Sequence, residues 1–179
     1  GTMRFSDYLA AEWKPALGCT EPGSIAYAAA SAAAQAHGQV RAVHLRCDAR
    51  IYKNCYAVGI PHSGHKTGIR WAIAIGSLLP DPSARLEVFT QATAEILDEA
   101  GRLVESGAVS VEVVPERAEL LVDCRVVRAG GTGRAVIERE HTRLTRLERD
   151  GQAVDLGASA GGEPGSAGAA SPSVREELG

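Results

Sequence analysis

The fold class depends on one stretch of sequence, Val109-Ser110-Val111-Glu112-Val113-Val114, which is followed by Pro115-Glu116. Before it, residues 86–105 repeat their apolar side chains with the period of a helix. Within it, apolar and polar residues alternate, as in a strand that buries one face. The change of period at residue 109 therefore separates a helical part of the chain from a part rich in strands.

Strands continue to follow one another after this change. The same alternation predicts strands over 120–127, 134–139 and 144–148. Turn-forming pairs, Gly130-Gly131 and Asp150-Gly151, separate or close these strands. We therefore expect several strands linked by hairpins.

The first half of the chain is predicted to be mainly helical. An Ala-rich helix is expected over 23–37, where Gly38 ends it, and another over 67–79. A strand over 40–46 lies between them, and a short amphipathic helix over 5–13 precedes them. This order of elements predicts an α+β fold, in which Ala-rich helices pack on a mixed, mainly antiparallel sheet in a single domain.

The composition is that of a globular chain and excludes some partners. The 179 residues are 45% hydrophobic and 23% charged, which is sufficient for a core. Only 4% are aromatic, while 20 residues are Gly, so the core must use Ala, Val, Leu and Ile with close backbone approaches. The 19 Lys and Arg against 22 Asp and Glu give a net charge of −3, which argues against a nucleic acid as partner.

The ends of the chain are expected to lie outside the folded domain. Gly1-Thr2 ahead of Met3 is interpreted as a cloning scar, and residues 157–179 as a disordered Gly, Ala, Ser and Pro tail. The domain is therefore predicted to cover residues 3–156. No apolar run reaches the roughly 18 residues of a membrane span, and no targeting signal is evident, so we expect a cytoplasmic protein.

Three of the four cysteines, and the acidic residues, are interpreted as structural. Cys47, Cys55 and Cys124 form no C-x-x-C pair, and we expect small buried side chains, with convergence on a metal or cluster as the alternative. The acidic residues are scattered and are interpreted as a solvated surface on helical faces.

Cys19 differs because it lies in Leu17-Gly18-Cys19-Thr20-Glu21-Pro22, directly before the Ala-rich helix. A thiol at this place is close to unpaired backbone N–H groups and to the positive end of the helix dipole, and both favour the thiolate. The carboxylate of Glu21 opposes this effect. Cys19 is therefore a candidate base or nucleophile, and a buried Cys beside a helix cap formed by Thr20 or Glu21 is the alternative.

A second candidate site consists of two stretches. One is Tyr52-Lys53-Asn54, in a mixed apolar and polar stretch to which no helix or strand is assigned, and the other is the loop Pro61-His62-Ser63-Gly64-His65. The loop precedes a predicted helix and so presents backbone amides to a carboxylate or phosphate, although it lacks the P-loop spacing. The Lys–Asn pair could bind a substrate carboxylate, and either histidine could transfer a proton near neutral pH. A glycine-rich turn with exposed histidines is the alternative.

The motifs together resemble a known family. The chain is similar to the N-terminal half of the L-cysteine desulfidases, relatives of the iron–sulfur L-serine dehydratases. The resemblance extends over residues 12–151, and the Leu-Gly-Cys-Thr-Glu-Pro block is its most specific element. The matching motifs, in order, are Leu17 to Pro22, Tyr52-Lys53-Asn54, Val58-Gly59-Ile60-Pro61 and His141-Thr142.

This resemblance implies a lyase that eliminates a β-substituent from a small α-amino acid and releases a 2-oxo acid and ammonia. The family uses a 4Fe–4S cluster rather than pyridoxal phosphate, and its cluster-ligating cysteines lie in a C-terminal half that this chain lacks. We therefore expect one subunit of a split enzyme, whose partner subunit ligates the cluster, while this chain supplies no metal ligand.

The resemblance also implies roles for particular residues. From the resemblance, Cys19 is the expected proton acceptor. The family's loop after Ile-Pro is rich in glycine and threonine, whereas here His62, Ser63 and His65 occupy it, so the expectation that His62 or His65 assists the leaving group rests on the residue type alone. The expected substrate-binding residues are Thr20, Glu21, Lys53, Asn54, Ser63, Gly64, His141 and Thr142. Two other classes of function stay open: a non-catalytic module that binds or senses an amino acid, and a metal-free Cys-dependent enzyme.

Overall fold

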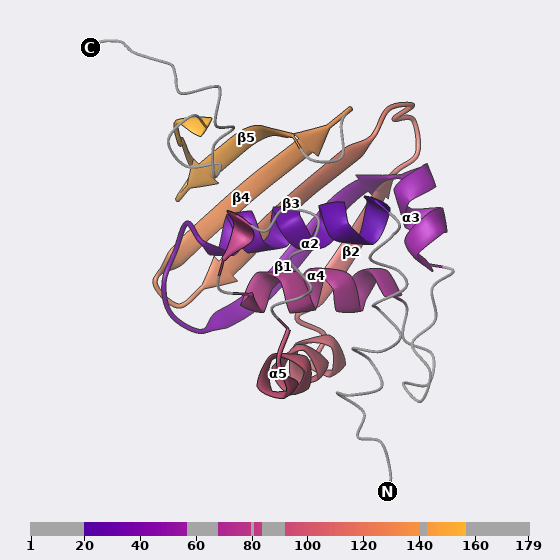
Figure 1. The fold of residues 1–179 in the computed structure, drawn as a ribbon. Coiled ribbons are helices and arrows are strands. Elements are labelled where there is room, and N and C mark those ends of the chain that lie inside the picture. The colour runs from indigo at the N-terminus through magenta and orange to yellow at the C-terminus, as the bar shows by residue number, and fades with distance from the viewer. Residues whose placement is uncertain (1–19, 57–67, 80, 84–91, 140–142, 157–179) are drawn as a thin grey trace, which may run out of the picture.

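The computed structural model describes residues 20–56, 68–79, 81–83, 92–139 and 143–156 (Figure 1). The predicted helix over 5–13, the cloning scar and the predicted tail lie outside these residues. The helices are α2 (Thr20–Ala33), α3 (Ala49–Tyr56), α4 (Gly68–Leu78) and α5 (Ala94–Glu105). The strands are β1 (Val40–Asp48), β2 (Val109–Val114), β3 (Leu121–Arg128), β4 (Gly131–Glu138), β5 (Leu144–Arg149) and β6 (Gln152–Ala153).

All six strands form one mixed sheet in the order β2-β1-β3-β4-β5-β6. Strands β1 and β2 are parallel, and every other neighbouring pair is antiparallel. At the β5–β6 turn, Asp150 and Gly151 have φ values of 51° and 85°. Two successive positive φ angles are the geometry of a type I′ hairpin turn, for which Asp-Gly is a favoured pair. The predicted turn at this position is therefore confirmed.

The expectation of hairpins is wrong for one connection. β2 does not pair with β3, because β1 lies between them: Cys47 is opposite Val113 on one side and Val122 on the other. A parallel pair requires a long crossover, and α3, α4 and α5 all occur between β1 and β2. The strand over 40–46 is thus a central strand of the sheet, which its sequence pattern alone did not indicate.

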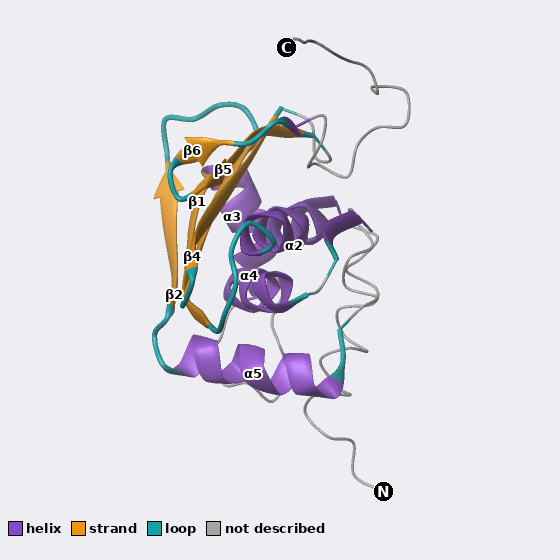
Figure 2. Ribbon diagram, turned by 90° about the vertical axis from the view of Figure 1, so that its left-hand side faces the viewer, coloured by secondary structure: helices purple, strands orange, loops and turns teal. Residues whose placement is uncertain are grey.

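The helices cover one face of the sheet (Figure 2). α2 and α4 lie side by side, α2 contacts β3 and β4, and α5 packs against α4. The architecture is an α+β fold with helices on a mixed, mainly antiparallel sheet, as predicted. Among the described helices, none combines the length and apolarity that crossing a membrane would require.

Several helix boundaries differ from the prediction, and α2 begins at Thr20 rather than at residue 23. α2 ends at Ala33 rather than at residue 37, and the following turns are tighter, with Gln35 N–H donating to Ala32 O at 3.1 Å. α5 begins at Ala94 rather than at residue 86, because Thr93 caps it by accepting a hydrogen bond from Ile96 N–H at 3.2 Å. Residues 84–91 lie outside the described part of the chain. The prediction for α2 continued a helical pattern through residues that form turns, and the prediction for α5 continued it through the cap residue Thr93.

The core uses small side chains and close backbone approaches, as the composition predicted. The alanines of α2 are buried on all sides of the helix, against the sheet on one side and α4 on the other. Gly76 of α4 lies so close to α2 that a Cβ atom there would be 2.6 Å from Ala26 O. Gly133 of β4 approaches Ala32 O in the same way, with no room for a side chain.

We expect Gly76→Ala to destabilise the protein, although Gly→Ala inside a helix is normally stabilising by about 1 kcal/mol. The added methyl group would overlap backbone atoms of Ala26, which cannot rotate away, so the expected loss is about 3 kcal/mol. Urea denaturation measures this loss. The control is Gly101→Ala in α5, whose Cβ would meet only a ring atom of Trp71 at 3.1 Å and should change stability less. Equal effects of the two variants would contradict the close packing of α2 and α4.

Candidate functional site

One end of the molecule, which we call the α3 end, collects the segments that flank the candidate site residues. The C-terminal end of β1 leads into α3 there. Asp48, the last residue of β1, accepts a hydrogen bond from Leu121 N–H at 2.7 Å, so β3 begins at the same end. The sheet register places Leu121 opposite Glu138, which ends β4, and Ile137 opposite Leu144, which begins β5.

The helices α2 and α4 also begin at the α3 end. The C-terminal turn of α2 lies at the opposite end of the sheet, where Arg128 Nη1 donates to Ala33 O at 2.7 Å. The first turn of α2 is therefore at the α3 end, and α2 and α3 are in contact. α4 runs alongside α2 in the same direction and also contacts α3 (Figure 1). Two helix N-termini and the carboxyl ends of two parallel strands thus meet in one region.

Helix α3 occupies the stretch to which the sequence pattern assigned no element, and its two faces differ. Ile51 and Cys55, one turn apart, are buried against the core, whereas Lys53 and Asn54 are exposed. The helix is fixed at its start by Asp48, whose Oδ1 accepts a hydrogen bond from Ile51 N–H at 2.8 Å. This is the bond of an N-cap residue. The sequence does contain a signal for α3: Asp48, a favoured N-cap residue, is followed by the apolar residues Ile51 and Cys55, which are four positions apart.

The other predicted site residues are only partly described. Thr20 and Glu21 lie in the first turn of α2 by their backbone. Cys19 and the residues His62, Ser63, Gly64, His65, His141 and Thr142 lie outside the described part of the chain. The described elements next to these residues nevertheless lie at the α3 end. Cys19 precedes the start of α2, the histidine loop connects α3 to the start of α4, and His141 follows the last residues of β4. The topology therefore brings the flanks of all four motifs together.

The α3 end carries positive groups that suit an anion, beside the carboxylate of Asp48, whose two oxygens accept backbone hydrogen bonds. The N-termini of α2 and α4 each carry a partial positive charge from unpaired N–H groups. Lys53 adds a full positive charge in the last turn of α3. A carboxylate or phosphate is the chemical group that such an arrangement can hold.

The three described cysteines, Cys47, Cys55 and Cys124, are buried in the core, as predicted. Burial, with a smaller contribution from Asp48, raises the pKa of the Cys47 thiol to about 12. Burial, with a smaller contribution from Asp123, also raises the pKa of Cys124. The thiolate is the form that reacts and binds metals, so neither thiol is suited to either task. Within the described ranges, no three His, Cys, Asp or Glu side chains are placed to hold a metal ion.

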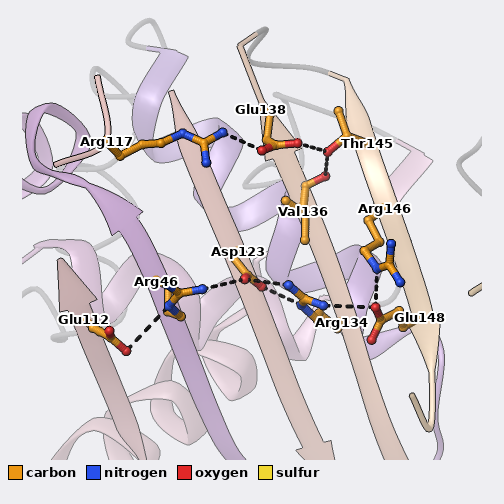
Figure 3. Close-up of polar contacts among 10 residues, drawn as sticks. All are labelled: Arg46, Glu112, Arg117, Asp123, Arg134, Val136, Glu138, Thr145, Arg146 and Glu148. Carbon is orange, nitrogen blue, oxygen red and sulfur yellow. Dashed lines mark hydrogen bonds and ion pairs between the residues drawn. The ribbon is translucent and has the colours of Figure 1, made fainter. Parts of the chain in front are cut away.

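The acidic residues correct another prediction. Asp123 and Glu148 are not on solvated helical faces but on strands, with side chains only 9% and 11% exposed. They lie on the face of the sheet that no described helix covers, within a chain of ion pairs across five strands (Figure 3). The chain of charges consists of Glu112, Arg46, Asp123, Arg134, Glu148 and Arg146.

Arg134 is the centre of this ion-pair chain. Its Nε and Nη2 each donate to one carboxylate oxygen of Asp123 at 2.9 Å, and its Nη1 donates to Glu148 at 3.0 Å. The hydrogen bond from Arg146, together with the charge of Arg134, lowers the pKa of Glu148. The sequence patterns did not reveal the network, because they assigned the acidic residues to helical faces and gave no register for the strands. Asp123, Arg134 and Glu148 lie on β3, β4 and β5, which are neighbours as expected. Only the pairs of Arg46 cross the unexpected order β2-β1-β3. The network stabilises the sheet and lies on its open face, away from the candidate site.

The known proteins to which this chain is similar are much longer than the chain itself. No family profile matches the chain. The chain is 40% identical over 148 residues to a UPF0597 protein of Geobacter sulfurreducens, covering 83% of this chain and 34% of that protein. A UPF0597 protein of Nitratidesulfovibrio vulgaris is 38% identical over 152 residues, covering 85% of this chain and 34% of the relative. A third, from Kosmotoga olearia, is 31% identical over 157 residues.

The chain therefore spans about a third of the length of the curated relatives it matches. The names of these relatives state no activity. No solved structure matches the chain.

We expect Arg134→Met to lower stability by about 3 kcal/mol at pH 7, because two nearly buried carboxylates lose their shared partner. A carboxylate whose pKa is lowered by folding contributes stability above its unfolded pKa of about 4.3 and loses it as the pH falls through the folded value. The deficit of the variant should therefore shrink below about pH 4, as Glu148 becomes protonated. Urea denaturation at pH 7 and pH 3 measures both values.

The control for this measurement is Arg102→Met in α5. Arg102 pairs with Glu99 on the surface, so its loss should cost at most about 0.5 kcal/mol. A deficit of Arg134→Met that stays constant between the two pH values would contradict the role assigned to the carboxylates.

Proposed function

We propose that this chain is one subunit of a split 4Fe–4S-dependent lyase, which converts a small α-amino acid into a 2-oxo acid and ammonia. The carbon–sulfur or carbon–oxygen bond at Cβ is the bond that breaks, as in desulfidation or dehydration. The observation that carries the proposal is the convergence, at the α3 end, of the elements that flank the four motifs of the lyase-like pattern. The length of the relatives is consistent with a larger catalytic unit.

Cys19 is the proposed base. It directly precedes α2, whose dipole stabilises a thiolate at its N-terminus. The thiolate accepts the Cα proton, and the electron pair of the Cα–H bond forms the Cα=Cβ bond as the leaving group departs with the electrons of its bond to Cβ. The resulting enamine is hydrolysed by water to the 2-oxo acid and ammonia. His62 or His65 is the proposed acid that protonates the leaving group.

The carboxylate of the substrate is the group that this chain would bind. Lys53 and Asn54 are exposed at the α3 end and provide a cation and an amide for it. Ser63 and Gly64, with Thr20 and Glu21, complete the proposed binding residues, and His141 and Thr142 are assigned a supporting place. Holding the substrate in one orientation brings its Cα–H bond to the base.

The cluster belongs to the proposed partner subunit. The described residues of this chain offer no ligand set for it, because its described thiols are buried and lie in no metal-binding group. The described residues are therefore assigned no part in holding the cluster. Among alternatives, a metal-free Cys-dependent enzyme would be active as the isolated chain, and a binding module would bind an amino acid without turning it over.

The proposed activity can be tested by anaerobic reconstitution. The purified chain should be colourless and inactive, and together with the cluster-bearing subunit it should be brown and release 2-oxo acid from L-cysteine, L-serine or L-threonine. Cys19→Ser keeps the size of the side chain but removes the thiolate, so turnover should fall by at least about 100-fold. Full turnover by Cys19→Ser would rule out the assigned base. Turnover by the isolated chain would support the metal-free alternative.

The role of Lys53 has a separate test. Loss of a hydrogen bond to a charged group should raise KM for the amino acid about tenfold in Lys53→Ala, with a smaller change in kcat. Arg41→Ala is the matched control, since Arg41 is an exposed cation near the opposite end of β1. If both variants raise KM equally, general electrostatic attraction rather than a binding site explains the effect.

A further inference from the structure

Asp48 is a buried carboxylate that neither the motifs nor the proposed reaction uses. It is only 4% exposed, at the junction of β1 and α3. Both of its oxygens accept backbone hydrogen bonds: Oδ1 from Ile51 N–H at 2.8 Å and Oδ2 from Leu121 N–H at 2.7 Å. The two donors are 70 residues apart in the sequence, one in the first turn of α3 and one at the start of β3. One side chain thus joins three elements at the α3 end.

Helix α3 depends on this residue more than a long helix would. It has eight residues, which is about two turns and roughly 12 Å, and nucleation of so short a helix is unfavourable without tertiary support. Its buried side chains, Ile51 and Cys55, fix its rotation against the core. They do not fix where it begins. The bond from Ile51 N–H to Asp48 sets its first residue, and the bond from Leu121 ties that point to the sheet.

The placement of α3 decides where Lys53 and Asn54 lie. Both residues are on its exposed face, within two turns of the cap. If the first turn frays, half of the helix is lost, and these side chains lose a defined position relative to the starts of α2 and α4. A side chain displaced by about 1 Å no longer makes a good hydrogen bond to the bound group, and the loss of a hydrogen bond to a charged group lowers the affinity.

We propose that Asp48 is a positioning residue for the site, which holds Lys53 and Asn54 in place through α3 without touching the substrate. This inference rests on the proposed function for its kinetic consequence. Its structural part, that Asp48 fixes α3 to the sheet, does not depend on the reaction.

The experiment compares Asp48→Ala, which removes both hydrogen bonds, with Asp48→Asn. The Asn variant keeps an acceptor oxygen for Ile51 N–H but directs an amide NH2 group toward Leu121 N–H, so it should retain the cap and lose the tie to β3. In the assembled enzyme, Asp48→Ala should raise KM for the amino acid about tenfold, with kcat changed less than about threefold. Asp48→Asn should lie between this variant and the natural protein.

Thr93→Ala is the matched control, because it removes an N-cap of the same kind from α5. If the loss of an N-cap acted only by lowering the stability of the protein, Thr93→Ala and Asp48→Ala would change KM to the same extent. An equal rise of KM in Thr93→Ala and Asp48→Ala, or a fall of kcat at unchanged KM in Asp48→Ala, would overturn the positioning role.

Hydrogen exchange of the full-length chain without its partner gives a readout that needs no activity. In both Asp48 variants, the amides of residues 52–56 should exchange faster, by about tenfold in Asp48→Ala, while in Thr93→Ala they should stay within about twofold of the natural protein. Unchanged exchange of these amides in Asp48→Ala would overturn the inference even where KM rises. If the natural assembly turns over no amino acid, the proposed function fails, and faster exchange in α3 alone still supports the structural part. If Asp48→Ala does not fold, Asp48→Asn provides the same comparison.

Discussion

Backbone contact around α2 is the constraint on which the rest of the structure depends. α2 is enclosed by the sheet on one side and by α4 on the other, and at Gly133 and Gly76 the neighbouring chains approach closer than a Cβ atom would permit. Interiors are packed as densely as organic crystals, so such contacts allow little displacement. The direction of α2 follows from them. Its C-terminal turn is held at one end of the sheet, and the residues that precede Thr20 are thereby delivered to the other.

The fold class could be predicted because it depends on local patterns. The change from helical to alternating periodicity at Val109, the Asp150-Gly151 turn and the scarcity of aromatic residues each have a direct structural counterpart. Strand order could not be predicted in the same way. The parallel pairing of β1 and β2 joins residues 66 positions apart, such as Val43 and Val109, and no local pattern specifies such a partner. The ion pairs of Arg46 with Glu112 and Asp123 depend on the same strand order.

The sequence singled out residues for the candidate site, but it did not indicate the elements that support them. Lys53 and Asn54 could be singled out by residue type and motif, and the structure places them on the exposed face of a helix. The helix itself was not predicted, because two turns are too short for a clear period and Asp48 resembles any surface acid in the sequence. What distinguishes Asp48 is its hydrogen bond to Leu121, a residue from a strand that lies far along the chain. Residues that act through others are therefore harder to find than residues that act directly.

The parallel pair β1–β2 explains why a site can form at the α3 end at all. In an antiparallel sheet, neighbouring strands alternate in direction and connect by tight turns, which leave little chain for a pocket. Two parallel strands instead end on the same side, and their crossover brings α3 and the start of α4 to that side. α2 adds a second helix N-terminus there because its packing against Gly133 and Gly76 fixes its direction. The single parallel pair thus gives the molecule one end rich in helix N-termini, and the motif residues precede or follow the elements that meet there.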